Sequence, residues 1–161
     1  MSERFTTKSE IVAVVLEDGA EVRRYRTTNF LTELGEAHIA DQLSDSGQSA
    51  MSHMAIGDDS GQTAASTTLA NELARVALDA TYPKQGTGAS DTVLGRVVRD
   101  NEVLYRGTFA AGTGTGTITE FAVLNNSSGG TMLNYAEPSP AWVKGAGQEL
   151  IIVMALTIGA S

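Results

Sequence analysis

The chain has 161 residues, of which 42% are hydrophobic and 19% charged, a balance that excludes a disordered tail and fits a globular protein. Its 11 basic and 19 acidic residues leave a net charge of −8, which disfavours a nucleic-acid partner because phosphates attract basic surfaces. The chain has no cysteine, which excludes disulfides, thiolate catalysis and sulfur-ligated metals.

The length fits one domain over residues 1–161. The longest uncharged apolar run, residues 150–158, is far shorter than the roughly 20 residues that cross a bilayer, so no membrane span is predicted. The N-terminus has no apolar signal core, and we expect the chain to stay in the compartment where it is made. The polar residues 1–8 are predicted to form a flexible arm.

The first predicted element is a hairpin. Residues 11–16 and 22–26 read as two strands joined at Asp18-Gly19, a dipeptide that tolerates positive φ. The second strand carries a run of charge at Arg23, Arg24 and Arg26, with Tyr25 among them. Such a run is typical of a solvated strand face, and a docking patch for an acidic partner is the sharper alternative.

A helix follows the hairpin. Thr32 is predicted as its N-cap, Glu33 and Glu36 favour the N-terminal dipole, and Gly47 lies beyond its end. The helix has a broad apolar face, which should lie against a sheet. This face comprises Leu34, Ala37, Ile39, Ala40 and Leu43.

The rest of the chain reads as strands and loops. Residues 51–56 are a predicted strand, residues 57–68 a long polar loop, and residues 69–76 fit either a helix or a strand. Further strands are predicted at residues 93–98, 103–111, 118–124, 132–135, around Trp142, and at 149–158. Eight to ten strands with one helix predict a mainly β, single-domain sandwich or barrel, jelly-roll-like, with the helix packed against the sheet.

No pattern of catalytic residues stands out. His38 and His53 lack the spacing of a metal site, and the run GDDSG at residues 57–61 departs from the trypsin-like nucleophile motif by an extra Asp and by Gln62. The acidic loop leaves a weak surface cation site as a minor alternative. The Gly/Thr repeat at residues 111–117 lacks the lysine of a phosphate loop. We expect no enzymatic activity, no cofactor and no metal.

Several short motifs occur in a fixed order along the chain. They are LTELGEAHIADQL (residues 31–43), MAIGDD (54–59), TTLANELAR (67–75) and ITEFAVLNNSSGGTML (118–133). This series resembles small structural proteins of tailed bacteriophages, including head decoration (cement) proteins and the N-terminal domains of tail-collar and tail-fibre proteins. The matching positions are Gly57, Leu69, Glu72, Arg75, Glu120 and Gly130.

The resemblance implies a capsid decoration protein, made in the bacterial host cytoplasm, that binds the major capsid protein on the outer surface of the virion as a homotrimer. In that role the arm and the arginine run would dock on an acidic shell. A tail accessory protein is the alternative within the virion class. From another class, a carbohydrate-binding β-sandwich could stack sugars on Trp142, Tyr135 and Tyr82.

The residues also suggest how the long loop is held. Glu72 and Arg75 lie three positions apart, and Glu120 begins a strand that we expect to face them. A Glu–Arg–Glu network would then fix the loop that follows Gly57. The loop is therefore predicted to be a positioned connection that contains no active site.

Overall fold

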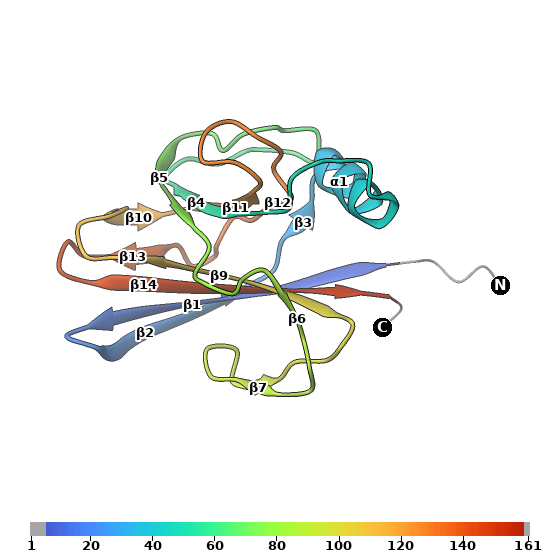
Figure 1. Cartoon of the computed structure of the whole chain (residues 1–161). Coiled ribbons are helices and arrows are strands. Elements are labelled where there is room, and N and C mark those ends of the chain that lie inside the picture. Colours follow the sequence, from blue (N-terminus) through green and yellow to red (C-terminus); the bar gives the residue numbers. More distant parts are fainter. Residues whose placement is uncertain (1–5, 160–161) are drawn as a thin grey trace.

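The computed structural model describes residues 6–159, and it confirms that the chain is mainly β, with 46% strand against 8% helix. Within this range the strands form two main layers of antiparallel sheet, and the one helix lies at one end of the upper layer (Figure 1).

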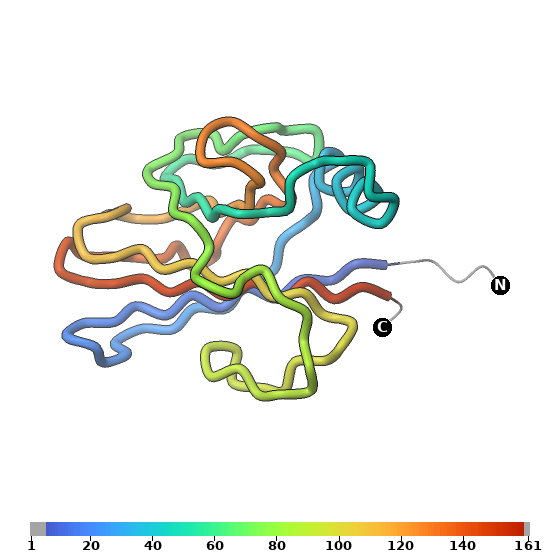
Figure 2. The backbone as a smooth tube through the Cα atoms, viewed as in Figure 1, coloured from blue at the N-terminus to red at the C-terminus, as the bar shows by residue number. Residues whose placement is uncertain are grey.

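The lower layer is the main sheet of five strands. In hydrogen-bonded order these are β2 (Ala20–Thr27), β1 (Thr7–Glu17), β14 (Glu149–Ile158), β9 (Glu102–Phe109) and β6 (Lys84–Gln85). The first and last strands of the chain thus lie side by side near the middle of this sheet (Figure 2).

The upper layer is built on a sheet of three strands, with two short pairs beside it and a third pair below the main sheet (Figure 1). The three strands are β11 (Glu120–Leu124), β4 (His53–Gly57) and β5 (Glu72–Ala77). The pairs are β10 (Gly116–Ile118) with β13 (Trp142–Lys144), β12 (Asn134–Tyr135) with β3 (Phe30–Leu31), and β7 (Ser90–Asp91) with β8 (Arg96–Val97).

The first hairpin is confirmed. Asp18 and Gly19 have φ values of 49° and 80°, so both turn residues use the left-handed region that Asp and Gly tolerate. The predicted arm over residues 1–8 is wrong at its end, because Thr7 and Lys8 are the first residues of β1 and pair with Ile158 and Thr157. Residues 1–5 of that arm lie outside the described residues.

The helix α1 (Glu33–Ser44) begins as predicted and packs differently. The Thr32 side chain accepts a hydrogen bond from Gly35 N at 2.9 Å, and the helix ends at Asp45 with a φ of 52°. A side chain at Gly35 would overlap the Leu133 backbone, which shows how closely the first turn approaches the neighbouring chain. Within α1 the buried residues are Gly35 and His38, whereas Leu43 is 80% exposed. Of the predicted apolar face, only Ile39 packs against the core, so the helix contacts the rest of the domain through a narrower face than predicted.

Three strand predictions also need revision. Residues 69–76, left open, contain a strand that begins at Glu72. The predicted strand 93–98 is largely a turn between β7 and β8, with only its last part in β8. The predicted strand 118–124 is divided at Thr119, because β10 pairs with β13 whereas β11 pairs with β4. This division moves the chain from one pair of strands to the next.

Two apolar cores lie on opposite faces of the main sheet. The larger core fills the space between the layers, and Trp142 is 1% exposed there, with its ring 5.9 Å from that of Phe121. The smaller core lies below the sheet, where Val93 and Leu94 pack over Val12 and Val14. Residues 86–101, which we call the cover loop, thus bury the outer face of the main sheet.

Candidate interaction surface

The long loop after β4, residues 58–71, is held by one buried carboxyl group. Glu120 is fully buried and pairs across the sheet with Gly57. Its two oxygens accept hydrogen bonds from Ala70 N at 2.8 Å and Asn71 N at 2.7 Å, and the Tyr135 hydroxyl donates to the same group at 3.1 Å. A Cβ at Gly57 would overlap the Glu120 carboxyl. The glycine therefore provides the space in which Glu120 binds the loop backbone.

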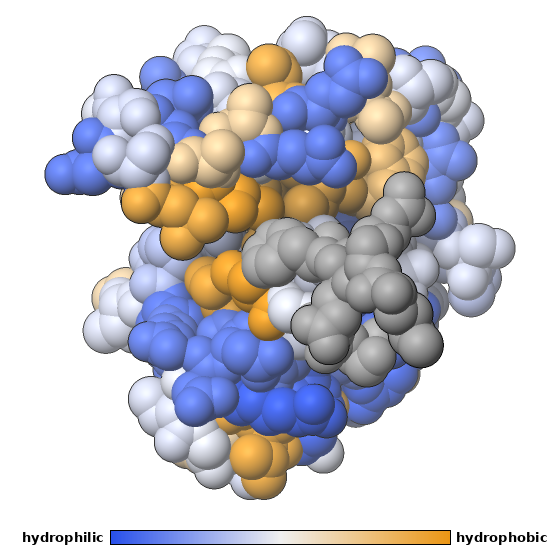
Figure 3. Space-filling model, turned by 90° about the vertical axis from the view of Figure 1, so that its right-hand side faces the viewer, coloured by the Kyte–Doolittle hydropathy of each residue, from blue (hydrophilic) through white to orange (hydrophobic). Residues whose placement is uncertain are grey.

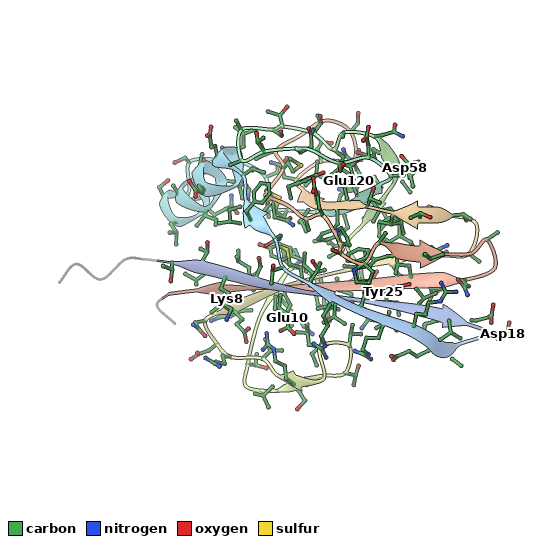
Figure 4. All side chains as sticks on the ribbon, turned by 180° about the vertical axis from the view of Figure 1, so that it is seen from behind. Lys8, Glu10, Asp18, Tyr25, Asp58 and Glu120 are labelled. Atoms are coloured by element: carbon green, nitrogen blue, oxygen red, sulfur yellow. The ribbon has the colours of Figure 1, made fainter. Side chains whose placement is uncertain are left out.

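A second carboxyl group holds the far part of this loop. Glu137 Oε1 accepts from Gly61 N at 2.6 Å and lies 3.2 Å from the Tyr135 hydroxyl. Burial, and then the charges of Glu120 and Glu137, raise the pKa of Tyr135, so this phenol stays protonated and can donate to either group. Figure 4 shows Glu120 and Asp58 in the upper layer, away from the main sheet. The loop is a positioned connection, as predicted.

The predicted Glu–Arg–Glu network is divided into two clusters. Arg75 forms an ion pair with Glu72 at 2.7 Å and donates to the carbonyls of Asn126 and Gly129 at 2.8 and 2.9 Å. Within residues 6–159, no ion pair or hydrogen bond joins Arg75 to Glu120. Arg75 therefore braces the turn after β11, while Glu120 braces the loop after β4.

The arginine run does not form one patch, because successive strand residues point to opposite faces. On the upper face, Arg23 donates to the Val143 carbonyl at 3.3 Å and the Tyr25 hydroxyl accepts from Val143 N at 3.3 Å. Figure 4 shows Tyr25 beside this upper layer. Two of the four predicted docking residues thus serve to join β2 to β13.

The other two arginines of β2 hold the cover loop. Arg24 donates to the Val93 carbonyl and pairs with Glu21 at 2.7 Å, which raises the pKa of its guanidinium. Arg26 pairs with Glu10 at 2.7 Å and donates to the Leu94 carbonyl at 3.2 Å. All four side chains of the run are therefore engaged within the chain, which weakens the interpretation as an open docking patch.

The cover loop carries the largest ion-pair cluster of the described residues. Arg96 lies 2.7 Å from Glu102 and 2.8 Å from Glu10, and these contacts line a polar pocket of about 520 Å³ below the main sheet. Hydrogen bonding to Arg96 is the main cause that lowers the pKa of Glu102, whose side chain is 4% exposed. Each carboxylate here has a cation beside it, so the cluster serves to hold the cover loop.

The aromatic platform proposed for sugar binding is not available. Trp142 is 1% exposed and Tyr135 is fully buried, so neither ring can stack on a ligand at the surface. The third residue, Tyr82, lies beneath Lys84, whose Nζ is 4.6 Å from the ring centroid. This geometry contradicts the carbohydrate alternative in the form that the sequence suggested.

The histidines do not come together. His38 Nδ1 lies 3.3 Å from Gln48 Oε1, and His53 Nδ1 lies 2.8 Å from the Ser52 hydroxyl. Among residues 6–159, no group of three or more potential ligands is arranged to hold a metal ion. No helix among the described residues has the length and hydrophobicity needed to span a membrane.

An apolar groove runs beside α1, and it is the feature that sequence reasoning missed. It has a volume of about 300 Å³ between the helix and the start of β1, and Thr7 and Glu36 stand at its polar margin. Figure 3 shows hydrophobic side chains in a hollow between the upper layer and the main sheet. The apolar lining comes from Leu31, Ile39, Ala40 and Leu43. The apolar face of the helix is the sequence feature that could have indicated this groove, but such a face equally predicts burial in the core.

Charge is distributed unevenly around this groove. Between Thr27 and Ala74 the sequence contains seven acidic residues and no lysine or arginine, so this stretch carries nearly all of the net charge of −8. Glu33 and Glu36 are exposed on α1, and none of the ion pairs in the described part of the chain involves a carboxylate of this helix. The helix side of the groove is therefore acidic through Glu33 and Glu36.

Comparison of the chain with protein families, with curated proteins and with solved structures finds no match in any of the three.

Proposed function

We propose that this chain is a structural protein of a tailed-phage virion, without enzymatic activity, and that it decorates the outer surface of the head. The observation that carries the proposal is the apolar groove beside α1, with Leu43 80% exposed. Exposed apolar patches on a folded domain mark sites of protein contact. The resemblance of the motifs to phage structural proteins supplies the class of partner, which is the major capsid protein.

The bracing of the loops supports a structural role. Residues 58–71 and the cover loop are both fixed by hydrogen bonds to carboxyl groups or arginines, so their backbones are ordered before any partner binds. A preorganised surface loses little conformational entropy on binding. That property suits a protein that stabilises a shell. Production in the host cytoplasm, assembly as a homotrimer and the absence of nucleic-acid and membrane partners belong to the same proposal.

The test is co-sedimentation of the purified protein with separated heads and tails of the phage that encodes it, together with its mass in solution. We expect a trimer that pellets with heads. A protein that pellets only with tails would replace the head assignment by the tail accessory alternative, and a protein that binds neither would contradict the virion proposal.

A further inference from the structure

The groove beside α1 differs from the other hollows of the chain in its chemistry. Its lining is mostly apolar, whereas the pocket at the cover loop is lined by Arg96 with Glu10 and Glu102, both of which pair with this arginine. The most exposed large apolar side chain of the described residues, Leu43, lies in the groove wall, and Leu34 of the same helix is 39% exposed. An occupant would therefore gain apolar contacts here that water does not provide.

The surroundings of the groove define the charge of that occupant. Glu36 lies in the groove wall and Glu33 is exposed one turn earlier, while Asp41 accepts hydrogen bonds from Gln48 N at 3.0 Å and Gln42 Nε2 at 3.2 Å. The helix has no basic residue in its last turn. A positively charged segment would be attracted to this surface, and an acidic one would be repelled.

We infer that the α1 groove is the docking site for a short segment of the shell protein that places one bulky apolar side chain beside a lysine or arginine. This inference rests on the proposed function, since that function supplies the shell as the partner. It reverses the charges expected from the sequence, where Arg23, Arg24 and Arg26 were to meet an acidic shell. Those arginines are bound to Val143, Val93 and neighbouring carboxylates, whereas Glu33 and Glu36 of α1 face solvent.

The size of the groove limits what it can hold. About 300 Å³ accommodates one or two large side chains and no folded domain. The apolar anchor supplies the contact at the centre, and the acidic margin guides the approach of the basic neighbour and makes binding sensitive to salt.

The experiment compares three proteins in co-sedimentation with purified heads. Leu43→Lys places a positive charge at the groove wall and should weaken head binding at least tenfold. The matched control is Val22→Lys, which makes the same change at an exposed aliphatic residue of β2, near the hairpin tip at the opposite end of the molecule (Figure 1). We expect Val22→Lys to bind within twofold of the unmodified chain, with thermal unfolding showing that both variants fold.

A second variant tests the charge. The double change Glu33→Gln and Glu36→Gln keeps the groove shape and should weaken binding several-fold at low salt, with a smaller loss of affinity as salt rises. Equal affinity and equal salt dependence in this variant would overturn the assignment of a basic occupant.

The outcomes separate the two levels of inference. If the unmodified chain does not bind heads, the proposed function and the docking site fail together. If it binds heads and Leu43→Lys binds equally well, only the docking site fails. If Leu43→Lys converts an oligomer to a monomer in solution, the groove is occupied by a second copy of the chain, and the shell-segment inference is overturned.

Discussion

The loop after β4 and the cover loop are both long connections held by a carboxyl group. The first carboxyl group binds neutral donors, whereas the second binds a cation. Glu120 is fully buried and bonds to two backbone N–H groups and a tyrosine, with no cation among these contacts. Glu102 bonds to the guanidinium of Arg96, which is 34% exposed. The first arrangement depends on burial and the second on charge, so they should respond differently to mutation, salt and pH.

The largest effect is expected at Glu120. Glu120→Ala removes a fully buried side chain and leaves the part-buried N–H groups of Ala70 and Asn71 without this acceptor, at a total of about 2–4 kcal/mol. We expect the melting temperature to fall by on the order of 10 °C, with little dependence on salt. The measurement is thermal unfolding at low and high salt.

Glu137→Gln is the control for this variant. Glu137 is exposed, and water can replace its bond to Gly61 N. Glu137→Gln should therefore lower the melting temperature much less than Glu120→Ala does. Equal effects of the two substitutions would contradict the central role of Glu120.

Gly57 should be the next most sensitive position in the same region. A methyl group there would overlap the Glu120 carboxyl and the Asn71 carbonyl, so Gly57→Ala should cost about 1–3 kcal/mol through overpacking. Gly147→Ala is the control, because a Cβ at that glycine meets no atom within 4 Å. Chemical denaturation of both variants measures the difference. A neutral Gly57→Ala would show that the sheet adjusts freely at this point.

The cover loop should respond to salt and acid. Arg96→Ala removes the main partner of Glu102, and we expect a loss of about 1–2 kcal/mol, reduced from that of a fully buried pair because Arg96 is a third exposed. Added salt should reduce the difference in the free energy of unfolding between Arg96→Ala and the unmodified chain. Arg99→Ala is the control, since no ion pair of the described residues includes the Arg99 side chain.

The pH dependence has a definite sign here. The pKa of Glu102 is lowered in the folded chain relative to its ordinary value of 4.5, so its contribution to stability is complete above pH 4.5 and is lost as pH falls below that value. Arg96→Ala should remove part of this acid dependence. Unfolding measured from pH 6 to pH 3 checks this, and parallel curves for both proteins would refute it.

The smallest effect is expected at His53. Burial, and then the charge of Arg75, lower the pKa of this histidine below 6.5 in the folded chain. The unfolded chain therefore takes up the proton first as pH falls through 6.5, and stability decreases in that window. His53→Gln should flatten this slope. The test is denaturant unfolding at pH 7.5 and pH 5.5 for both proteins.

Local signals in the sequence identified the hairpin and the start of the helix. Asp18-Gly19 and the Thr32 N-cap act within a few residues, so their effects can be read without knowledge of the rest of the chain. Two of the partners of Glu120 lie about 50 residues away and are backbone groups, which carry no signature in the sequence. A charged pair was therefore predicted where a carboxyl–backbone cluster is present.

The sequence also did not predict how the helix and the arginine run are oriented in the fold. An apolar face on α1 indicated burial, but the sequence could not tell that Gly35 would approach Leu133 and leave Leu43 exposed. The arginine run likewise indicated one surface, although the strand period sends Arg24 and Arg26 to the face opposite Arg23 and Tyr25. Side chains alternate between the two faces of any strand, so the division of this run could have been predicted from the sequence.

The position of β14 in the main sheet has a consequence for synthesis on the ribosome. This strand follows all the other strands of the chain, yet it lies between β1 and β9 and pairs with both. Until β14 has been synthesised, β1 and β9 each have one unpaired edge. The apolar side chains of β1 are then only partly covered. Such late, long-range pairing slows folding and exposes strand edges to association. We therefore expect incomplete chains that lack β14 to associate more readily than the whole domain.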